Sequence, residues 1–597
     1  MEKRVVLAVV LTIGVIFLSN FLFPSPEPPP GEMATETVQV DGGVAPGGLD
    51  TEAPAARDTA DRADVTPAVP EQDRIIGGDP VEEPASLSAD LSEQPADTVT
   101  VTTDLVRLQF STRGASLMSA ELLEYESYTP NGTEDHPAQL VRGGDRVFGY
   151  RVVVAGDTIR LDGQSFTADR TELTLTENHP RDSLVFRYPF PSGAAEFVVT
   201  YGFEIDSYLV DVSGRVEGIG DRGYSILTSL GQGLRTNEKD AQDDFRQLAY
   251  VVRGQDGRIE SENLDKVEPG SLRTADGGPF DWVAVKNKYF VIALVSPEAG
   301  PAFGGMLVMG EPAEHTARMV ASQPAPAGSG FGFQAYMGPQ EYGRLEAVGR
   351  SRDLEHVNPY GWRWMRPIIR PLVGIVMVIL EWMHNFLGLA YGWVLILFGI
   401  SMRVVLFPLY QKSMRSQMAQ MQVQPLMKEL QAKYKDEPQK LQSEMMKLYK
   451  EHNVNPLGGC LPMLLPMPIL FALFFVFQST IEFRGVPFLW LPDLSLKDPY
   501  YIIPLLMGAS MFLLSWIGQR GMEANAQMKM MTYMMPAVFT VMFANFPSGL
   551  NLYYATSNLA SLPQQLYLSK ERKAAKRKAD QYKAKAGKDD GDGGGSG

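Results

Sequence analysis

The chain has 597 residues, a formal net charge of -16 and a single cysteine, Cys460. One cysteine excludes a disulfide framework and a cysteine-based zinc site. The six histidines are scattered, and the sequence carries no P-loop, HExxH or GxSxG motif. Acidic residues crowd the first half, and basic residues cluster near 411–450 and 570–588, so overall charge does not favour a DNA-binding protein. We therefore expect no catalytic residue, no metal site and no cofactor.

The first 23 residues predict a membrane anchor. Lys3 and Arg4 precede an apolar run from Val5 to Phe23, which is long enough to cross a bilayer. A cleaved signal peptide is the alternative, although the run is long for one and no small-residue cleavage motif follows it. Residues 24–96 are rich in Pro, Gly, Ala, Asp and Glu, and this composition predicts a disordered tether.

Residues 97–345 show the two-residue period of β-strands. Val106, Leu108 and Phe110 alternate with polar residues, and the pattern recurs around Leu173 and Val210. Turns rich in Gly, Asp and Asn separate these runs, which predicts an antiparallel β-sandwich. A carbohydrate-active domain would need two convergent carboxylates, and a sequence cannot show convergence. We expect a folded extracytoplasmic module without chemistry of its own.

Long apolar runs in residues 390–568 predict a bundle of membrane-spanning helices. The candidate spans are Tyr391–Tyr410, Gly458–Ser479, Tyr501–Ile517, Met530–Phe546 and Ser548–Leu568.

A further apolar run lies within residues 360–389 and is ambiguous. If it crossed the membrane, the basic segments at 411–450 and 570–588 would both face outward, against the positive-inside rule. Arg363, Arg366 and Arg370 recur at helical spacing, which suits an amphipathic helix at the lipid surface. The prediction is therefore six spans in total, five of them in the core, with both termini in the cytoplasm.

Residues 411–457 predict a cytoplasmic helical hairpin. Met445 shares a helical face with Leu441 and Leu448 in the second helix. The first helix carries Met414, Met418 and Met421. Such methionines are either ordinary packing or an adaptable surface for varied apolar segments.

Polar residues interrupt the predicted spans. Arg403 lies inside Tyr391–Tyr410, where an arginine costs about 2.5–3.5 kcal/mol on insertion scales. It either faces a partner or a hydrated cavity, or extends to the inner interface. The last span carries a polar stripe at helical spacing, formed by Asn551, Tyr554, Asn558, Ser561 and Gln565.

The stripe and the arginine together predict a hydrated groove among the helices, with polar contacts that merely hold helices together as the alternative. No predicted span carries paired acids or an Asp/Glu/His relay, and no inverted repeat is apparent. A solute transporter or channel is therefore the less favoured function.

Several motifs resemble those of the YidC-type membrane protein insertases. They are Arg403-Val-Val-Leu-Phe-Pro408, Asn455-Pro-Leu-Gly-Gly-Cys460 and Phe546-Pro-Ser-Gly-Leu-Asn-Leu-Tyr-Tyr554. The resemblance covers roughly residues 390–570 in order and spacing. It implies a multidomain membrane protein that inserts and folds other membrane proteins, with an all-β supersandwich in the periplasm and an α-helical transmembrane bundle in the cell inner membrane.

The resemblance also implies a mechanism. Arg403 would attract polar or acidic tails of nascent membrane proteins into a groove that opens to the cytoplasm and the lipid bilayer. Arg403 is the groove residue that the resemblance supports, and the full set of predicted groove residues is Arg403, Asn545, Asn551, Tyr553, Tyr554 and Asn558. The hairpin would receive the substrate, the basic tail at 569–597 would contact the ribosome, and the protein would act alone or with the Sec translocon. Pro466, Gly399 and Asn545 depart from residues that are common in the family.

Overall fold

A computed structural model describes residues 96–589 with short gaps. The gaps are 129–135, 192, 194, 221, 276, 299, 313–315, 362–363, 409–410, 412–422, 424–425, 428–429, 436, 452–466 and 521–525. The predicted anchor at 1–23 and nearly all of the predicted tether at 24–96 lie outside the described residues.

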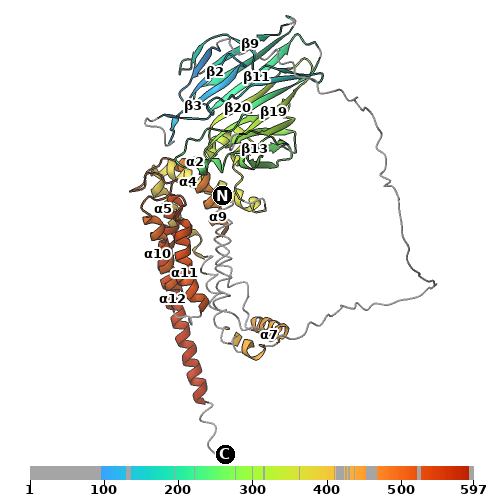
Figure 1. Cartoon of the computed structure of the whole chain (residues 1–597). Helices are drawn as coiled ribbons and strands as arrows, with labels where there is room; N and C mark the ends of the chain where they lie inside the picture. Colours follow the sequence, from blue (N-terminus) through green and yellow to red (C-terminus); the bar gives the residue numbers. More distant parts are fainter. Residues whose placement is uncertain are drawn as a thin grey trace, which may run out of the picture. The chain divides into compact units, whose positions relative to one another are not determined.

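Three β-sheets form the first part of the described chain (Figure 1). The first has the order β4-β3-β2-β1-β8, with β1 (Thr98–Thr102), β2 (Val106–Ser111), β3 (Ser116–Glu126), β4 (Pro137–Gln139) and β8 (Glu172–Thr174). The second has the order β14-β13-β16-β17-β20-β11-β10-β9-β7, with β7 (Thr167–Ala168), β9 (Arg181–Pro189), β10 (Glu196–Glu204), β11 (Leu209–Glu217), β13 (Ala249–Gly254), β14 (Ile259–Asn263), β16 (Phe280–Lys286), β17 (Phe290–Val295) and β20 (Phe331–Pro339). The third has the order β15-β18-β19-β12-β5-β6, with β5 (Tyr150–Val154), β6 (Asp157–Arg160), β12 (Tyr224–Gly231), β15 (Leu272–Thr274), β18 (Gly305–Gly310) and β19 (Ala317–Ala325).

The predicted alternation is confirmed in these strands. Val106, Leu108 and Phe110 are buried in β2, while Arg107 between them is exposed. β17 is buried along its whole length, as expected of a strand covered on both faces. The antiparallel prediction holds for the strand pairs of the described chain except β1 with β8, which run parallel. The long chain from β2 to β7 provides the crossover that a parallel pair needs.

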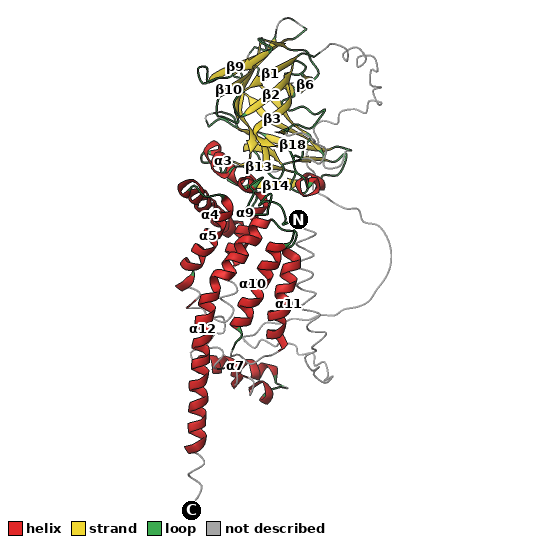
Figure 2. Cartoon of the chain, turned by 90° about the vertical axis from the view of Figure 1, so that its left-hand side faces the viewer, coloured by secondary structure: helices red, strands yellow, loops and turns green. Residues whose placement is uncertain are grey.

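Helices form most of the remaining described chain (Figure 2). They are α2 (Ala241–Phe245), η1 (Leu264–Lys266), α3 (Tyr342–Gly349), η2 (Leu354–Val357), α4 (Arg366–Leu387), α5 (Tyr391–Val405), α7 (Pro438–Glu451), α9 (Met467–Ser479), η4 (Ile481–Phe483), α10 (Ile502–Gly518), α11 (Ala526–Phe543) and α12 (Ser548–Asp589). α12 packs against α5, α9 and α10, and α10 packs against α11. α12 continues well past Leu568, where the sequence predicts the last span to end.

Among the described helices, α4 alone combines the length and apolarity of a membrane span. α5, α10, Pro468–Ser479 and Thr532–Phe543 are apolar but shorter. α4 is the helix that the sequence predicts at the lipid surface. Val373 and Leu380 are buried in the helical core, whereas Ile375 and Trp382 are exposed, so α4 has apolar side chains on both faces. The helix ends at Gly388, which adopts a left-handed conformation with φ 62°.

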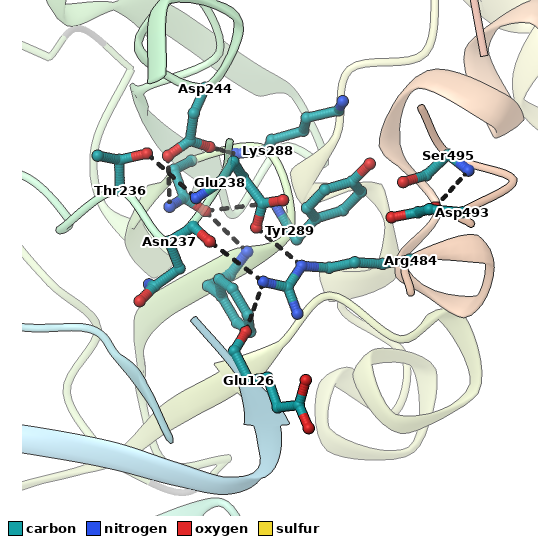
Figure 3. A network of polar contacts seen from close by, with 12 residues as sticks. Glu126, Thr236, Asn237, Glu238, Asp244, Lys288, Tyr289, Arg484, Asp493 and Ser495 are labelled. Carbon is teal, nitrogen blue, oxygen red and sulfur yellow. Dashed lines mark hydrogen bonds and ion pairs between the residues drawn. The ribbon is translucent and has the colours of Figure 1, made fainter. Parts of the chain in front are cut away.

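η4 and the residue after it join the helices to the β-sheets. Ile481 belongs to the hydrophobic core of the sheets, whereas Phe483 belongs to the core of the helices. Figure 3 shows Arg484 reaching into the β-sheet part: its Nε donates to Oε1 of Glu238 at 2.8 Å and its Nη2 donates to the carbonyl of Glu126 at 2.7 Å. Its guanidinium also lies 4.3 Å from the ring centroid of Tyr128.

The side chain of Arg484 is 3 % exposed and that of Glu238 is 9 % exposed. A buried ion pair with further hydrogen bonds is costly to break from one side, because the remaining charge keeps its desolvation cost. The short segment from Ile481 to Arg484 is therefore a structural joint between α9 and the sheets.

Candidate functional site

Arg403 lies in the last turn of α5 and contacts α12. Its Nε donates a hydrogen bond to Oγ of Ser561, and Ser561 Oγ donates to the carbonyl of Ser557 at 2.6 Å. Arg403 is half-buried. Its position near the carboxyl end of α5 suits a cation, because the helix dipole places partial negative charge there.

A second polar contact joins α12 to α10. Nδ2 of Asn558 donates to Oγ of Ser510 at 3.2 Å, and Ser510 Oγ donates to the carbonyl of Met507 at 2.7 Å. Asn558 precedes Ser561 by three residues, so the two side chains share a face of α12. The structure thus brings together a cation from α5, an amide and a hydroxyl from α12 and a hydroxyl from α10.

The other predicted groove residues lie nearer the start of α12. Asn551 is fully buried and its Nδ2 donates to the carbonyl of Phe543 at 3.0 Å, which fastens α12 to the end of α11. The hydroxyl of Tyr554 reaches the carbonyl of Leu470 in α9 at 3.5 Å.

The ring of Tyr553 packs against Phe398 of α5, with centroids 5.7 Å apart. Asn545 is exposed in the turn between α11 and α12. Asn551 precedes Ser561 by ten residues, which corresponds to about 15 Å along a helix. The predicted residues therefore form two groups: Arg403 with Asn558, and Asn551 with Tyr553 and Tyr554.

The described part of the hairpin consists of α7, Gln411 and several residues between 423 and 437. Tyr449 of α7 is buried against Val423 and Met427, and its hydroxyl donates to Sδ of Met427 at 2.9 Å. Met445 is half-buried in α7. Met414, Met418 and Met421 lie outside the described residues.

Asp353, Glu355 and His356 form a group of potential metal ligands in the described chain. All three are half-buried, and Asp353 already pairs with Arg253 at 3.0 Å. This ion pair accounts for the position of Asp353 without a metal.

Sequence reasoning missed two charged residues of the joint, Glu482 and Arg484. Burial raises the pKa of Glu482 to about 7, and the negative charge of Glu341 adds to the effect. Glu238, the partner of Arg484, is 246 residues away in the chain. The local signal was only a pair of charged residues immediately after an apolar run.

Taken together, the fold and site define a membrane protein with a helical core and a large β-sheet domain, whose helices share a half-buried arginine among polar side chains. A family model described as "60Kd inner membrane protein" matches residues 382–576, and one described as "YidC periplasmic domain" matches residues 98–375. The chain belongs to the YidC family of membrane protein insertases.

The sequences of named relatives align with most of the chain. The membrane protein insertase YidC of Pelodictyon phaeoclathratiforme (strain DSM 5477 / BU-1) is 34% identical over 499 residues, which cover 80% of this chain and 83% of the relative. The YidC of Citrifermentans bemidjiense (strain ATCC BAA-1014 / DSM 16622 / JCM 12645 / Bem) is 31% identical over 581 residues, covering 96% and 99%. A crystal structure of an active YidC insertase with its first transmembrane domain resolved is 18% identical, with a TM-score of 0.32, and the match covers 80% of this chain and 95% of that one.

The chain is therefore an inner-membrane insertase with a periplasmic domain, and it is not an enzyme. It binds the membrane proteins that it inserts. The prediction of an insertase is confirmed, and the alternative of a solute transporter or channel is set aside.

Proposed function

We propose that insertion proceeds through a hydrated groove at the contact of α5, α10 and α12, with Arg403 as its positive charge. The observation that carries this proposal is the hydrogen bond from Arg403 to Ser561, beside the bond from Asn558 to Ser510. A cation in apolar surroundings attracts an acidic or polar tail more strongly than it would in water. Burial of the substrate's apolar helix in lipid then drives its release, so no nucleotide is needed.

Asn551, Tyr553 and Tyr554 extend this proposed groove towards the start of α12. Asn545, in the turn before α12, lies at that end of the proposed groove. The three side chains contact α11, α5 and α9 respectively, so each links α12 to a different helix. A substrate segment moving along α12 would meet both groups of residues.

The proposed topology has six spans, namely the anchor at 1–23 and five in the core at 390–568, with both termini in the cytoplasm. Residues 24–96 form the tether and residues 97–345 the periplasmic domain, with its sheets arranged as a supersandwich. α4 lies at the membrane surface, as part of the segment 360–389. Arg366 and Arg370 in its first turns and the exposed Ile375 and Trp382 suit that position.

The proposed partners beyond the substrates are the Sec translocon and the ribosome. α12 has 42 residues, which as one helix extend about 63 Å, roughly twice the hydrocarbon thickness of a bilayer. Its carboxyl-terminal part can therefore carry the basic residues of 569–597 beyond the membrane. The hairpin at 411–457, with Met414, Met418, Met421 and Met445, is the proposed first contact for nascent apolar segments.

A complementation experiment tests the role of Arg403. Cells depleted of their own insertase would receive wild type, Arg403→Ala, Arg403→Lys or the control Arg520→Ala, which removes an arginine that lies over the Trp516 ring instead. We expect Arg403→Ala to lower insertion of a test protein with an acidic tail by about tenfold, equivalent to 1.4 kcal/mol. Arg403→Lys should keep part of the activity, because it keeps the charge but loses the planar donor geometry.

The same test protein with a neutral tail is the internal control. Its insertion should depend much less on Arg403. Equal losses for acidic and neutral tails, at normal expression of the variant, would contradict an electrostatic role for this residue.

A further inference from the structure

A cavity of about 670 Å³ lies between the periplasmic domain and the carboxyl-terminal end of α9. The periplasmic domain contributes Arg246, Lys266 and Lys286, the segment that follows η2 contributes Asn358, and α9 contributes Phe475 and Gln478. The cavity shares no residue with the groove around Arg403. It is a separate feature of the molecule.

Lys286 is an unusual residue for the wall of such a cavity. It is 4 % exposed, at the end of β16, and its Nζ donates to Oδ1 of Asn358 at 2.6 Å. Within the described chain, no carboxylate forms an ion pair with it. Burial lowers the pKa of Lys286 to about 8, and the negative charge of Asp244 opposes this shift. An ammonium group has three donors, so Lys286 retains the capacity for an additional acceptor.

The composition of the wall indicates which acceptor fits. Arg246 and Lys266 add two cationic side chains to Lys286, against one carboxylate in the wall, Asp265. Lys286 is buried, Arg246 is half-buried and lies 3.9 Å from Asp243, and Lys266 is exposed. A cationic wall of this kind, with a spare donor on Lys286, is suited to an anion with several oxygen atoms, such as a phosphate.

A second observation indicates that the ligand also carries a hydrogen-bond donor. Oε1 of Gln478 is buried and has no hydrogen-bond partner within the described chain. A buried carbonyl without a partner costs about 1–3 kcal/mol, which a ligand with an N–H group would recover. The wall also includes the apolar rings of Phe475 and Tyr360.

We propose that this cavity binds the headgroup of phosphatidylethanolamine from the surrounding bilayer. Its phosphate would accept hydrogen bonds from Lys286 and the neighbouring cations, and its ammonium group would donate to Gln478. α9 is an apolar helix whose carboxyl-terminal residues line this cavity with the periplasmic domain. In the topology proposed above α9 crosses the membrane, which would place this end at the level of the lipid headgroups. A free phosphate ion shares the anionic part of this chemistry and lacks the donor.

Binding measurements on the full purified chain in detergent test the proposal. The probes are short-chain phosphatidylethanolamine, short-chain phosphatidylcholine and inorganic phosphate, followed by native mass spectrometry and titration. Phosphatidylcholine carries the same phosphate but no N–H donor. We expect wild type to prefer phosphatidylethanolamine, and we expect Gln478→Leu to lose that preference.

Variants at the residues that would bind the phosphate provide the second part of the experiment. Lys286→Gln should weaken lipid binding by about tenfold, or 1.4 kcal/mol. Lys497→Gln makes the same substitution at an exposed lysine that does not line the cavity and should bind as wild type does. Asn358→Asp places a carboxylate beside Lys286, so it should fold and still repel the phosphate.

Each outcome either supports or contradicts the proposed headgroup site. Equal lipid binding by wild type, Lys286→Gln and Asn358→Asp would overturn the site. Inorganic phosphate that binds through Lys286 while neither lipid does would overturn the lipid as ligand. Insertion activity is scored separately, so a failure here is distinguishable from a failure of the groove around Arg403.

Discussion

Two carboxylates at the contact between the helices and the sheets, Glu238 of the periplasmic domain and Glu482 of the joint, are both buried and differ in their partners. Burial raises the pKa of each, but Arg484 opposes the shift at Glu238. Oε2 of Glu482 has no hydrogen-bond partner within the described chain, and Glu341 adds a like charge nearby. Arg484 thus offsets part of the cost of charging Glu238, whereas burial and the charge of Glu341 both oppose ionisation of Glu482.

The first prediction concerns the pH dependence that Glu482 confers. Its pKa is about 7 in the folded protein against 4.5 for the free side chain, so the folded state holds the proton more tightly. The contribution of protonated Glu482 to the free energy of unfolding is fully present below about pH 4.5. It is lost as the pH rises to about 7, because the folded state must then give up that proton. Glu482→Gln should raise the free energy of unfolding at pH 8 by on the order of 3 kcal/mol.

Thermal unfolding of the purified chain in detergent, at about pH 5 and about pH 8, measures this effect. The stabilisation by Glu482→Gln should be large at the higher pH and small at the lower one. A gain of the same size at both values would show that the carboxyl group does not titrate in this range.

The second prediction concerns Arg484. Arg484→Gln leaves Glu238 buried without its cation, which should cost about 3–5 kcal/mol. The double variant Arg484→Gln/Glu238→Gln should recover most of that loss, because it removes both charges. The exposed pair Arg350–Glu298 is the matched control, and Arg350→Gln should change stability by less than about 1 kcal/mol. Chemical unfolding of all four proteins provides the comparison, and a double variant as unstable as the single one would contradict the ion-pair explanation.

At the scale of elements, the close approach of α10 and α11 depends on a glycine. A Cβ atom added at Gly508 would clash with Oγ1 of Thr540, which itself donates to the carbonyl of Pro536 at 2.7 Å. Ser510, two residues further along α10, holds Asn558 of α12. The spacing of α10 and α11 therefore also positions one side of the proposed groove.

The third prediction tests this packing. Gly508→Ala should destabilise the protein by about 1–3 kcal/mol, since overpacking forces the two helices apart. Thr540→Ala removes the obstructing oxygen and should restore much of the loss when combined with Gly508→Ala. Melting temperatures of the four proteins measure the coupling, and simple additivity of the two substitutions would exclude a direct clash.

The elements differ in how far local sequence could predict them. The alternation around Val106 and the apolar run of α4 are local patterns, and both gave the correct kind of element. The helix α4 extends over Arg366–Leu387, inside the predicted 360–389. The predicted last span ends with the apolar run at Leu568, whereas the helix α12 continues to Asp589, because helix formation needs no apolar residues once a Lys- and Ala-rich segment continues it.

The contacts of the candidate site could not be predicted from the sequence, and the reason is physical. The spacing of Asn551, Asn558 and Ser561 predicts a shared helical face, yet it does not predict which helix that face meets. The partners of Arg403 and Arg484 lie 158 and 246 residues away, and no local period encodes such pairs. Asn545 was predicted as a polar residue on another span, and the structure places it in an exposed turn between α11 and α12.

At the scale of the whole molecule, the two hydrophobic cores remain distinct. One comprises the side chains between the sheets and the other those between the helices. They meet at Ile481 and Phe483, two residues apart in η4. The periplasmic domain therefore has a defined attachment to the insertase core.

The fourth prediction concerns the tail that α12 carries. Replacing the lysines and arginines of 570–588 with glutamine should weaken ribosome binding and reduce its dependence on salt, because fewer phosphates of the RNA are neutralised. Co-sedimentation at several salt concentrations measures both effects. Insertion of a small protein added after its synthesis should be unchanged, and a loss there would assign the tail a role other than ribosome binding.

The attachment through Ile481 and Arg484 also has a consequence for the biogenesis of the insertase itself. Residues 97–345 leave the ribosome long before residues 481–484, so the surface that receives Arg484 has time to fold on the far side of the membrane first. If that surface is delayed or misfolded, Ile481 and Arg484 arrive without their binding sites, and the segment that follows α9 is left with an apolar and a charged side chain uncovered. The order of synthesis thus allows the periplasmic domain to fold before the segment that attaches the helices to it is made.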